Sequence, residues 1–158
     1  MSNTIRMACQ EIFREAFEGV APDKDYTWFV QGSEAILNTL QSLSAEQASK
    51  KLHGMTSTIG AHANHLCYFL HLFNANNRGS REPSDWEGSW DVQEFDENSW
   101  NDVVARTTQE YVEANRWYTE MGNFDVDLET FDDEIYVIAN IAHAAYHLGA
   151  IRALLPMV

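Results

Sequence analysis

The residues of this chain best suited to chemistry are two histidines four positions apart, His143 and His147, in the apolar stretch that ends near Leu155. On an α-helix this separation places two side chains on the same face, so both imidazoles can point toward one metal ion. Two further histidines, His62 and His65, lie in another apolar stretch far upstream. Two ligands from one helix and a third from another would leave a coordination position open, as a catalytic metal requires.

The upstream segment offers two candidates for the third ligand. With about 100° between successive residues of a helix, His62 lies nearer the centre of the apolar stripe of its segment and His65 lies near the edge. Core-facing geometry therefore slightly favours His62 and leaves His65 open. We assign no role to His53, in a polar linker, or to His71, which we expect on the exposed side of the helix. A His-x-x-x-His pair alone is weak evidence, because such pairs are commonly packed or surface histidines.

Several familiar metal-binding patterns are excluded. A zinc-protease helix reads His-Glu-x-x-His, but Ala144 follows His143. A di-iron carboxylate bundle needs Glu-x-x-His pairs, and no glutamate stands three positions before any of the six histidines. The chain also lacks a Walker loop, GxGxxG and GxSxG. What remains is a three-histidine site for a divalent ion such as zinc, nickel, iron or manganese.

Helices must position these histidines, because apolar residues recur at helical spacing and no alternating strand pattern stands out. The periodicity predicts helices over Asn3–Glu18, Tyr26–Leu43, Thr58–Asn74, Ser99–Met121 and Asp132–Leu155, and a short turn capped by Ser44. Ser99 and Asp102 resemble a capping box at the start of the fourth. We therefore predict an all-α fold, a four-helix bundle with an extra N-terminal helix. It forms one domain over 1–158, with the N-terminal helix in 1–22 and the bundle in 26–155.

The connection Arg78–Asn98 is long and carries Trp86, Trp90 and Phe95. A structureless loop of this length is unusual in a compact domain. The aromatic residues predict that the connection is pinned across the body of the protein. A connection of this length also permits a crossover, so the helices on either side of it can run parallel.

Composition narrows the function classes. The chain of 158 residues has a net charge of −14, and most of its 24 acidic residues fall between Glu82 and Glu134. Such a charge repels phosphate backbones and anionic membranes, so we expect no nucleic-acid or membrane partner. No apolar run approaches the roughly 20 residues that span a bilayer. The N-terminal residues do not contain the uninterrupted apolar core typical of a signal peptide, and the two cysteines do not form a CxxC pair. We expect a cytoplasmic protein.

Two motifs resemble the DinB/YfiT-like superfamily of metal-dependent enzymes. They are Thr58–Leu66, TIGAHANHL, and His143–Arg152, HAAYHLGAIR, and Asp85-Trp86 and Trp90 also resemble the tryptophan-bearing connection of that family. The resemblance spans roughly residues 26–155. It implies a bundle with up-down-down-up topology. It also implies that His65, His143 and His147 are the metal ligands, with His62 as the second choice or a supporting partner.

The resemblance also implies a function. Characterised relatives include thiol-dependent S-transferases and isomerases, so the resemblance implies a metal-dependent enzyme acting on a small electrophile with a low-molecular-weight thiol. Tyr146 could donate a proton, although we expect it to be packed in the core, and Arg152 is expected to pair with the acidic segment.

The alternative is a non-catalytic bundle that binds a small apolar ligand or a partner subunit. Its motivation is that no carboxylate or nucleophile can be tied to the histidines by spacing. In both cases we expect a homodimer formed through two helix faces.

Overall fold

The computed structural model describes residues 3–31, 34–80, 83–121 and 131–158, and within these ranges it contains helices and no strand. The long helices are α1 (Asn3–Glu18), α4 (Ile59–Asn77), α5 (Glu97–Met121) and α6 (Phe131–Leu154). The short ones are α2 (Ile36–Ser42), α3 (Ala45–Ser49) and the 3-10 turns η1 (Gly88–Trp90) and η2 (Leu155–Met157). The all-α prediction is confirmed.

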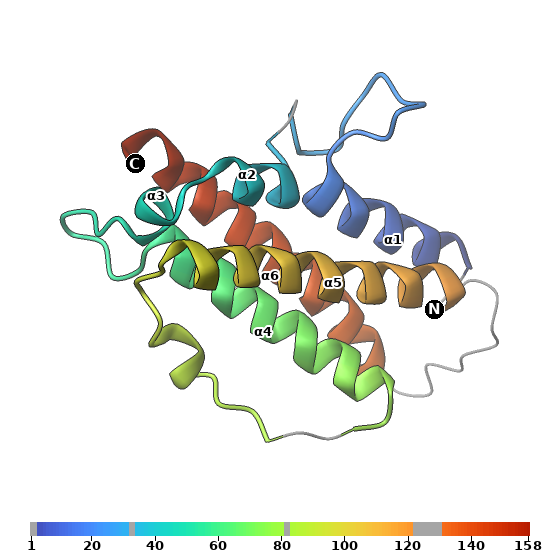
Figure 1. Cartoon of the computed structure of the whole chain (residues 1–158). Helices are drawn as coiled ribbons and strands as arrows, with labels where there is room; N and C mark the ends of the chain where they lie inside the picture. The colour runs from blue at the N-terminus through green and yellow to red at the C-terminus, as the bar shows by residue number, and fades with distance from the viewer. Residues whose placement is uncertain (1–2, 32–33, 81–82, 122–130) are drawn as a thin grey trace.

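The long helices pack as a bundle around one aromatic-rich core. α4 packs against α5 and α6, α1 also packs against α5 and α6, and α2 follows α1 along the same side (Figure 1). The N-terminal helix, expected as an addition to the bundle, is one of its walls, because Phe13 and Phe17 are fully buried against Tyr111. The up-down-down-up order of the whole chain stays a prediction.

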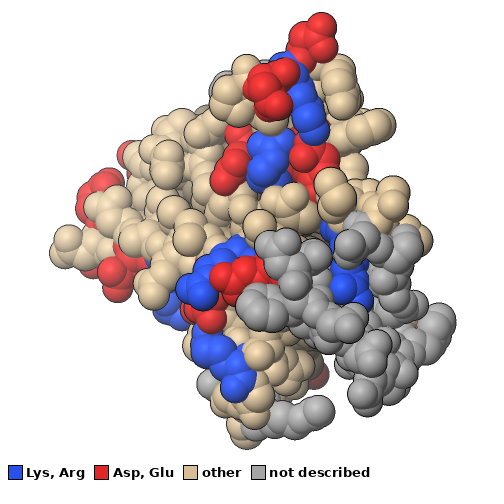
Figure 2. Space-filling view, turned by 90° about the vertical axis from the view of Figure 1, so that its right-hand side faces the viewer, with Lys and Arg blue, Asp and Glu red and all other residues tan. Residues whose placement is uncertain are grey.

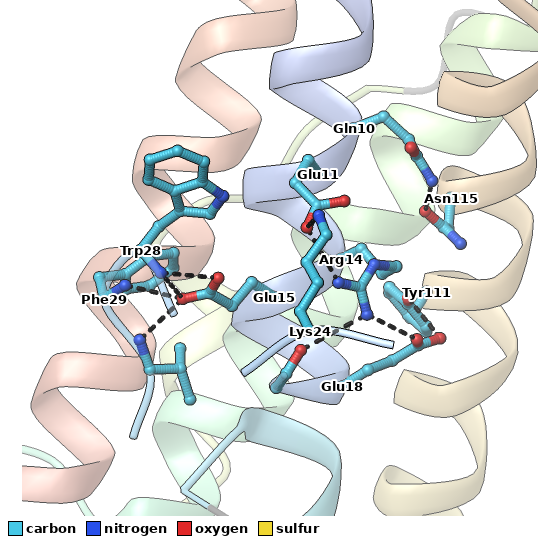
Figure 3. A network of polar contacts seen from close by, with 12 residues as sticks. Gln10, Glu11, Arg14, Glu15, Glu18, Lys24, Trp28, Phe29, Tyr111 and Asn115 are labelled. Carbon is cyan, nitrogen blue, oxygen red and sulfur yellow. Dashed lines mark hydrogen bonds and ion pairs between the residues drawn. The ribbon is translucent and has the colours of Figure 1, made fainter. Parts of the chain in front are cut away.

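The predicted helix Tyr26–Leu43 is wrong over most of its length, since only Ile36–Ser42 is helical among the residues of this range that the structure describes. The side chain of Glu15, 2% exposed, accepts hydrogen bonds from the backbone N–H groups of Trp28, Phe29 and Val30 at 2.7–2.9 Å (Figure 3). These successive donors bond to a carboxylate of α1 and are not used in a helix of their own. Residues 32–33 of the predicted helix lie outside the described ranges.

The start of α5 also differs from the prediction. Asp96, not Ser99, is the N-cap: the Asp96 carboxylate accepts from the Ser99 N–H at 2.7 Å, and the Ser99 hydroxyl accepts from the Asp96 N–H at 2.9 Å. This reciprocal pair is a capping box with its two residues in the order Asp-x-x-Ser. The capping box therefore begins three residues earlier than predicted.

The long connection crosses the outside of α4, as predicted, in its described part (Figure 1). At one end the Asp85 N–H donates to the Tyr68 hydroxyl at 2.6 Å. At the other end Thr58 donates two hydrogen bonds of 3.0 Å to Gln93, from its N–H to the side-chain oxygen and from its hydroxyl to the backbone carbonyl. The ring of Phe95 lies where a β-carbon on Gly60 would be, so this close approach requires glycine.

α4 and α5 run parallel as a result of this crossover. The start of α4 lies beside the residues that lead into α5, and the end of α4 lies beside the middle of α5, where Arg78 pairs with Glu113. α6 runs the opposite way to α4, because His62 lies opposite His147 and Phe73 lies opposite Tyr136.

No helix in the described ranges combines the length and the apolar character needed to cross a bilayer. On the face shown in Figure 2, acidic and basic side chains lie beside one another. Exposed side chains also form the ion pairs Arg78–Glu113 and Arg116–Glu120.

Candidate metal centre

The antiparallel packing of α4 and α6 brings three histidine nitrogens together. The Nε2 atom of His143 lies 3.2 Å from Nε2 of His65 and 3.1 Å from Nε2 of His147. His65 and His147 are buried and His143 is half-buried. The structure therefore joins the three residues that the motifs singled out, at a point where one ligand comes from α4 and two come from successive turns of α6.

These separations fit a shared ion. Zn–N bonds of about 2.0–2.1 Å place two tetrahedral ligand nitrogens about 3.3 Å apart, and a six-coordinate ion with similar bonds places neighbouring nitrogens about 3.0 Å apart. The 3.1 and 3.2 Å distances at His143 lie between these values. All three ligand atoms lie within 4.8 Å of one another. His65, His143 and His147 are thus close enough to hold one metal ion.

His65 is held in the tautomer that a ligand needs. Its Nδ1 lies 2.7 Å from the Ser89 hydroxyl oxygen, and that hydroxyl lies 2.7 Å from the Trp86 carbonyl oxygen. A hydroxyl has one proton, and the carbonyl can only accept, so Ser89 donates to Trp86 and accepts from the His65 Nδ1–H. In the neutral ring Nε2 then carries the lone pair and faces His143.

His147 has a different partner. Its Nδ1 lies 3.1 Å from Nδ1 of His62, which is buried and edge-on to the ring of Trp90. The sequence left open whether His62 replaces or supports His65. The geometry places His65 in the triad and His62 behind His147, where it contacts the nitrogen that faces away from the other two rings.

His143 is oriented by stacking. Its ring lies on the ring of Phe69, with centroids 4.0 Å apart and planes 28° apart. Its Nδ1 is buried and has no hydrogen-bond partner among the residues that the structure describes. On the other side of the site, Trp90 stacks on His65 with centroids 4.1 Å apart. Aromatic rings thus shield two of the three imidazoles from water.

Burial keeps the triad neutral. Desolvation, with a smaller contribution from the neighbouring imidazoles, lowers the pKa of His65 and of His143 to about 4 and that of His147 to about 2. Desolvation also lowers the pKa of His62. A neutral imidazole has the lone pair that a metal requires, so these rings are ready to act as ligands at neutral pH.

Other expected roles are corrected. Tyr146, expected in the core, is 63% exposed and touches the ring of His147 edge-on. Arg152 pairs with Glu34, which precedes the acidic segment that was expected to supply its partner. His71, expected on the exposed side, contacts Glu110 of α5 at 2.9 Å and is half-buried. His53 is exposed in a linker, as expected.

Ser89 and Phe69 are partners of the triad that were not predicted from the sequence. Ser89 has no fixed spacing to any histidine, and its only signal is its place in the tryptophan-bearing connection. Phe69 stands four positions after His65, a spacing that places both on one face of α4. This signal was present but indistinguishable from ordinary core periodicity.

Comparison with protein-family models, with curated proteins and with solved structures finds no match to this chain. The resemblance to the DinB/YfiT-like superfamily therefore rests on the two motifs and stays a prediction. The triad geometry is independent of it, because the atoms of the site come from the fold of this chain.

Proposed function

We propose that His65, His143 and His147 bind one divalent metal ion and that the protein is a metal-dependent enzyme. The observation that carries the proposal is that the Nε2 atoms of three neutral imidazoles lie close together. The Nδ1 atoms of His65 and His147 point away from them and have hydrogen-bond partners of their own. Imidazole sets of this kind suit zinc, nickel and iron, and manganese remains a candidate.

The residues around the triad support a catalytic site over a closed structural one. Three protein ligands leave room at the ion for water or substrate, and a bound divalent ion lowers the pKa of a coordinated water or thiol and polarises an electrophile. The chain supplies the orientation through Ser89 and His62, and the exclusion of water through Trp90 and Phe69.

The reaction we propose is thiol transfer to, or isomerisation of, a small electrophile with a low-molecular-weight thiol, as in DinB-like enzymes. Among the described residues, the hydrogen-bond and ring partners of the triad are a serine, a histidine and aromatic side chains. No carboxylate lies among them to act as a general base. This favours a reaction in which coordination itself activates the nucleophile, and coordination deprotonates a thiol readily.

Elemental analysis tests the proposal. Protein purified without added metal or a His-tag should contain about one metal ion per chain. A His65→Ala/His143→Ala/His147→Ala variant should contain none, whereas a His53→Ala control should match the wild type because His53 lies in an exposed linker. Absence of metal from the wild type, together with no uptake on titration, would contradict it.

The alternative is a non-catalytic bundle that binds an apolar ligand or a partner subunit, and one observation favours it. An apolar groove of about 320 Å³ lies between α1 and α6, lined by Ile5, Ala8, Cys9, Ile12, Ile138, Ile141, Ala142 and Ala145. A protein that keeps its fold and its binding partner when the triad is removed would support this alternative.

A further inference from the structure

A pocket of about 230 Å³ adjoins the triad. Its walls come from α4, the long connection and α6, the three elements that also hold the histidines and Ser89. The residues that line it are Phe69, Leu72, Asn76, Ser84, Trp86, Tyr136 and Ala139. Ala139 stands one helical turn before His143 on α6, and Phe69 stands one turn after His65 on α4.

Two residues belong to the pocket and also contact the triad. The ring of Phe69 lines the pocket and stacks on His143 with centroids 4.0 Å apart. Trp86 lines the pocket and lies 6.3 Å from the ring of His65, and the Phe69 and Trp86 rings are 5.9 Å apart. A molecule in the pocket is therefore next to the aromatic side chains that border the histidines.

The lining predicts the chemistry of the occupant. Among the residues that the structure describes, none that lines the pocket is charged, although the chain has a net charge of −14. Three are aromatic, Leu72 and Ala139 are aliphatic, and Asn76 and Ser84 add polar groups. An ionised group would lose its hydration here without gaining an oppositely charged partner, whereas a ring would gain apolar and aromatic contacts.

We propose that this pocket receives the aromatic or similarly apolar part of the substrate while the polar, reacting end of the same molecule extends past Phe69 and Trp86 to a metal ion on the triad. This inference rests on the proposed function and adds the substrate class: a small molecule with an uncharged ring at one end and a metal-binding electrophilic group at the other.

The test uses protein loaded with Co²⁺ and two probes that share a chelating group. Benzohydroxamate carries a phenyl ring and acetohydroxamate carries a methyl group in its place. Both are titrated while the visible absorption of Co²⁺ is recorded. Burial of the ring should make benzohydroxamate bind at least about tenfold more tightly.

An Ala139→Phe variant fills the pocket from α6. It should reduce the preference for the phenyl probe to about onefold and leave the affinities for Co²⁺ and acetohydroxamate unchanged. Ala153→Phe, at an exposed position of the same helix, is the matched control and should keep the full preference. Circular dichroism checks the fold, and Leu72→Phe fills the pocket from α4 if Ala139→Phe does not fold.

The outcomes separate the two proposals. Wild-type protein that takes up no Co²⁺ contradicts the proposed function and, with it, the pocket assignment. Protein that binds Co²⁺ but shows no preference for benzohydroxamate, or keeps the preference in the filled variants, overturns the pocket assignment alone. Protein that binds Co²⁺ but responds to neither probe has no coordination position open to a ligand, which contradicts the catalytic site as well as the pocket assignment. Loss of the preference in Ala153→Phe as well would show that the effect does not come from the pocket, and would overturn it too.

Discussion

An imidazole binds a metal only when the correct nitrogen carries the lone pair and the ring points at the ion, and different neighbours act on these conditions in the three histidines. The Ser89 hydroxyl fixes the tautomer of His65. The His62 imidazole contacts Nδ1 of His147, and stacking on Phe69 orients the ring of His143. The usual outer partners of metal-binding histidines are carboxylates, backbone carbonyls and water. Here the Trp86 carbonyl acts on His65 indirectly, because it accepts the hydrogen bond of the Ser89 hydroxyl.

Ser89→Ala should lower the affinity for metal about 10- to 100-fold without removing the site, because His65 would lose the acceptor that fixes its tautomer. Competition with a chromophoric chelator measures the affinity. Ser84→Ala is the control, since Ser84 is exposed on the same connection. Equal affinities in the wild type and Ser89→Ala would mean that packing alone orients His65.

His147→Ala should abolish tight metal binding and leave helicity largely intact. His147 is fully buried, but the core that surrounds it contains aromatic and aliphatic side chains from every long helix. Circular dichroism and metal titration on the same sample measure the two properties. A variant that is unfolded even with metal present would indicate a structural site and weaken the catalytic proposal.

The sequence could predict the triad but not its supports. His143 and His147 follow from spacing, because a separation of four residues is local. His65 followed from the motif, since the apolar stripe slightly favoured His62 and both side chains are in fact buried. Ser89 reaches His65 from a different element, 24 positions along the chain, and no local pattern encodes such a contact.

At the scale of elements, local sequence patterns predicted the helices correctly where the backbone groups of a segment bond to one another. α1 has the predicted bounds, and α4 and α6 differ from prediction by a few residues. The failure over residues 28–30 has a long-range cause, since Glu15 accepts hydrogen bonds from their backbone N–H groups, 13 to 15 positions away. The spacing of apolar residues within a segment does not reveal that a side chain on another helix will accept the hydrogen bonds of its backbone N–H groups.

Glu15→Gln should destabilise the protein by about 1–3 kcal/mol at neutral pH, because a carboxylate that accepts several backbone N–H groups is replaced by a neutral amide with one acceptor oxygen. Urea unfolding measures the difference in the free energy of unfolding. Glu46→Gln, at an exposed position of α3, is the control and should stay within about 0.5 kcal/mol.

The difference in the free energy of unfolding between the wild type and Glu15→Gln should depend on pH. Burial acts to raise the pKa of Glu15, but its hydrogen bonds to the N–H groups of Phe29, Trp28 and Val30 outweigh burial and hold the pKa below its usual range. The stabilisation is therefore complete above the unfolded pKa of about 4.3 and is lost as the pH falls through the lower folded pKa. The gap between wild type and Glu15→Gln should narrow in that acidic window. A gap that widens there would contradict the assignment.

At the scale of the whole molecule, the groove between α1 and α6 bears on the homodimer expected from sequence. Ile138, Ile141, Ala142 and Ala145 form a stripe at i, i+3, i+4 and i+7 on α6, and α1 offers a matching stripe beside it. Ile138 is 52% exposed. We propose that a second copy of the chain packs its own two stripes here, since such a surface complements itself about a two-fold axis.

Ile138→Lys should shift the protein from dimer to monomer in sedimentation velocity, because a charge would be buried at the centre of the interface. Val112→Lys is the control: Val112 is similarly exposed, at 58%, but lies on α5, away from the groove. A wild type that is monomeric at high micromolar concentration would contradict the dimer.

His65 and His143 are 78 positions apart in the chain. Closing so long a loop carries an entropic cost, and contacts of high sequence separation are slow to form. α6 alone can offer two imidazoles to an ion, whereas the third arrives only when α6 docks against α4. An ion held by all three joins the ends of this loop and acts as a reversible cross-link. In refolding experiments, tight metal binding should therefore appear only when α6 docks against α4, later than the formation of the helices.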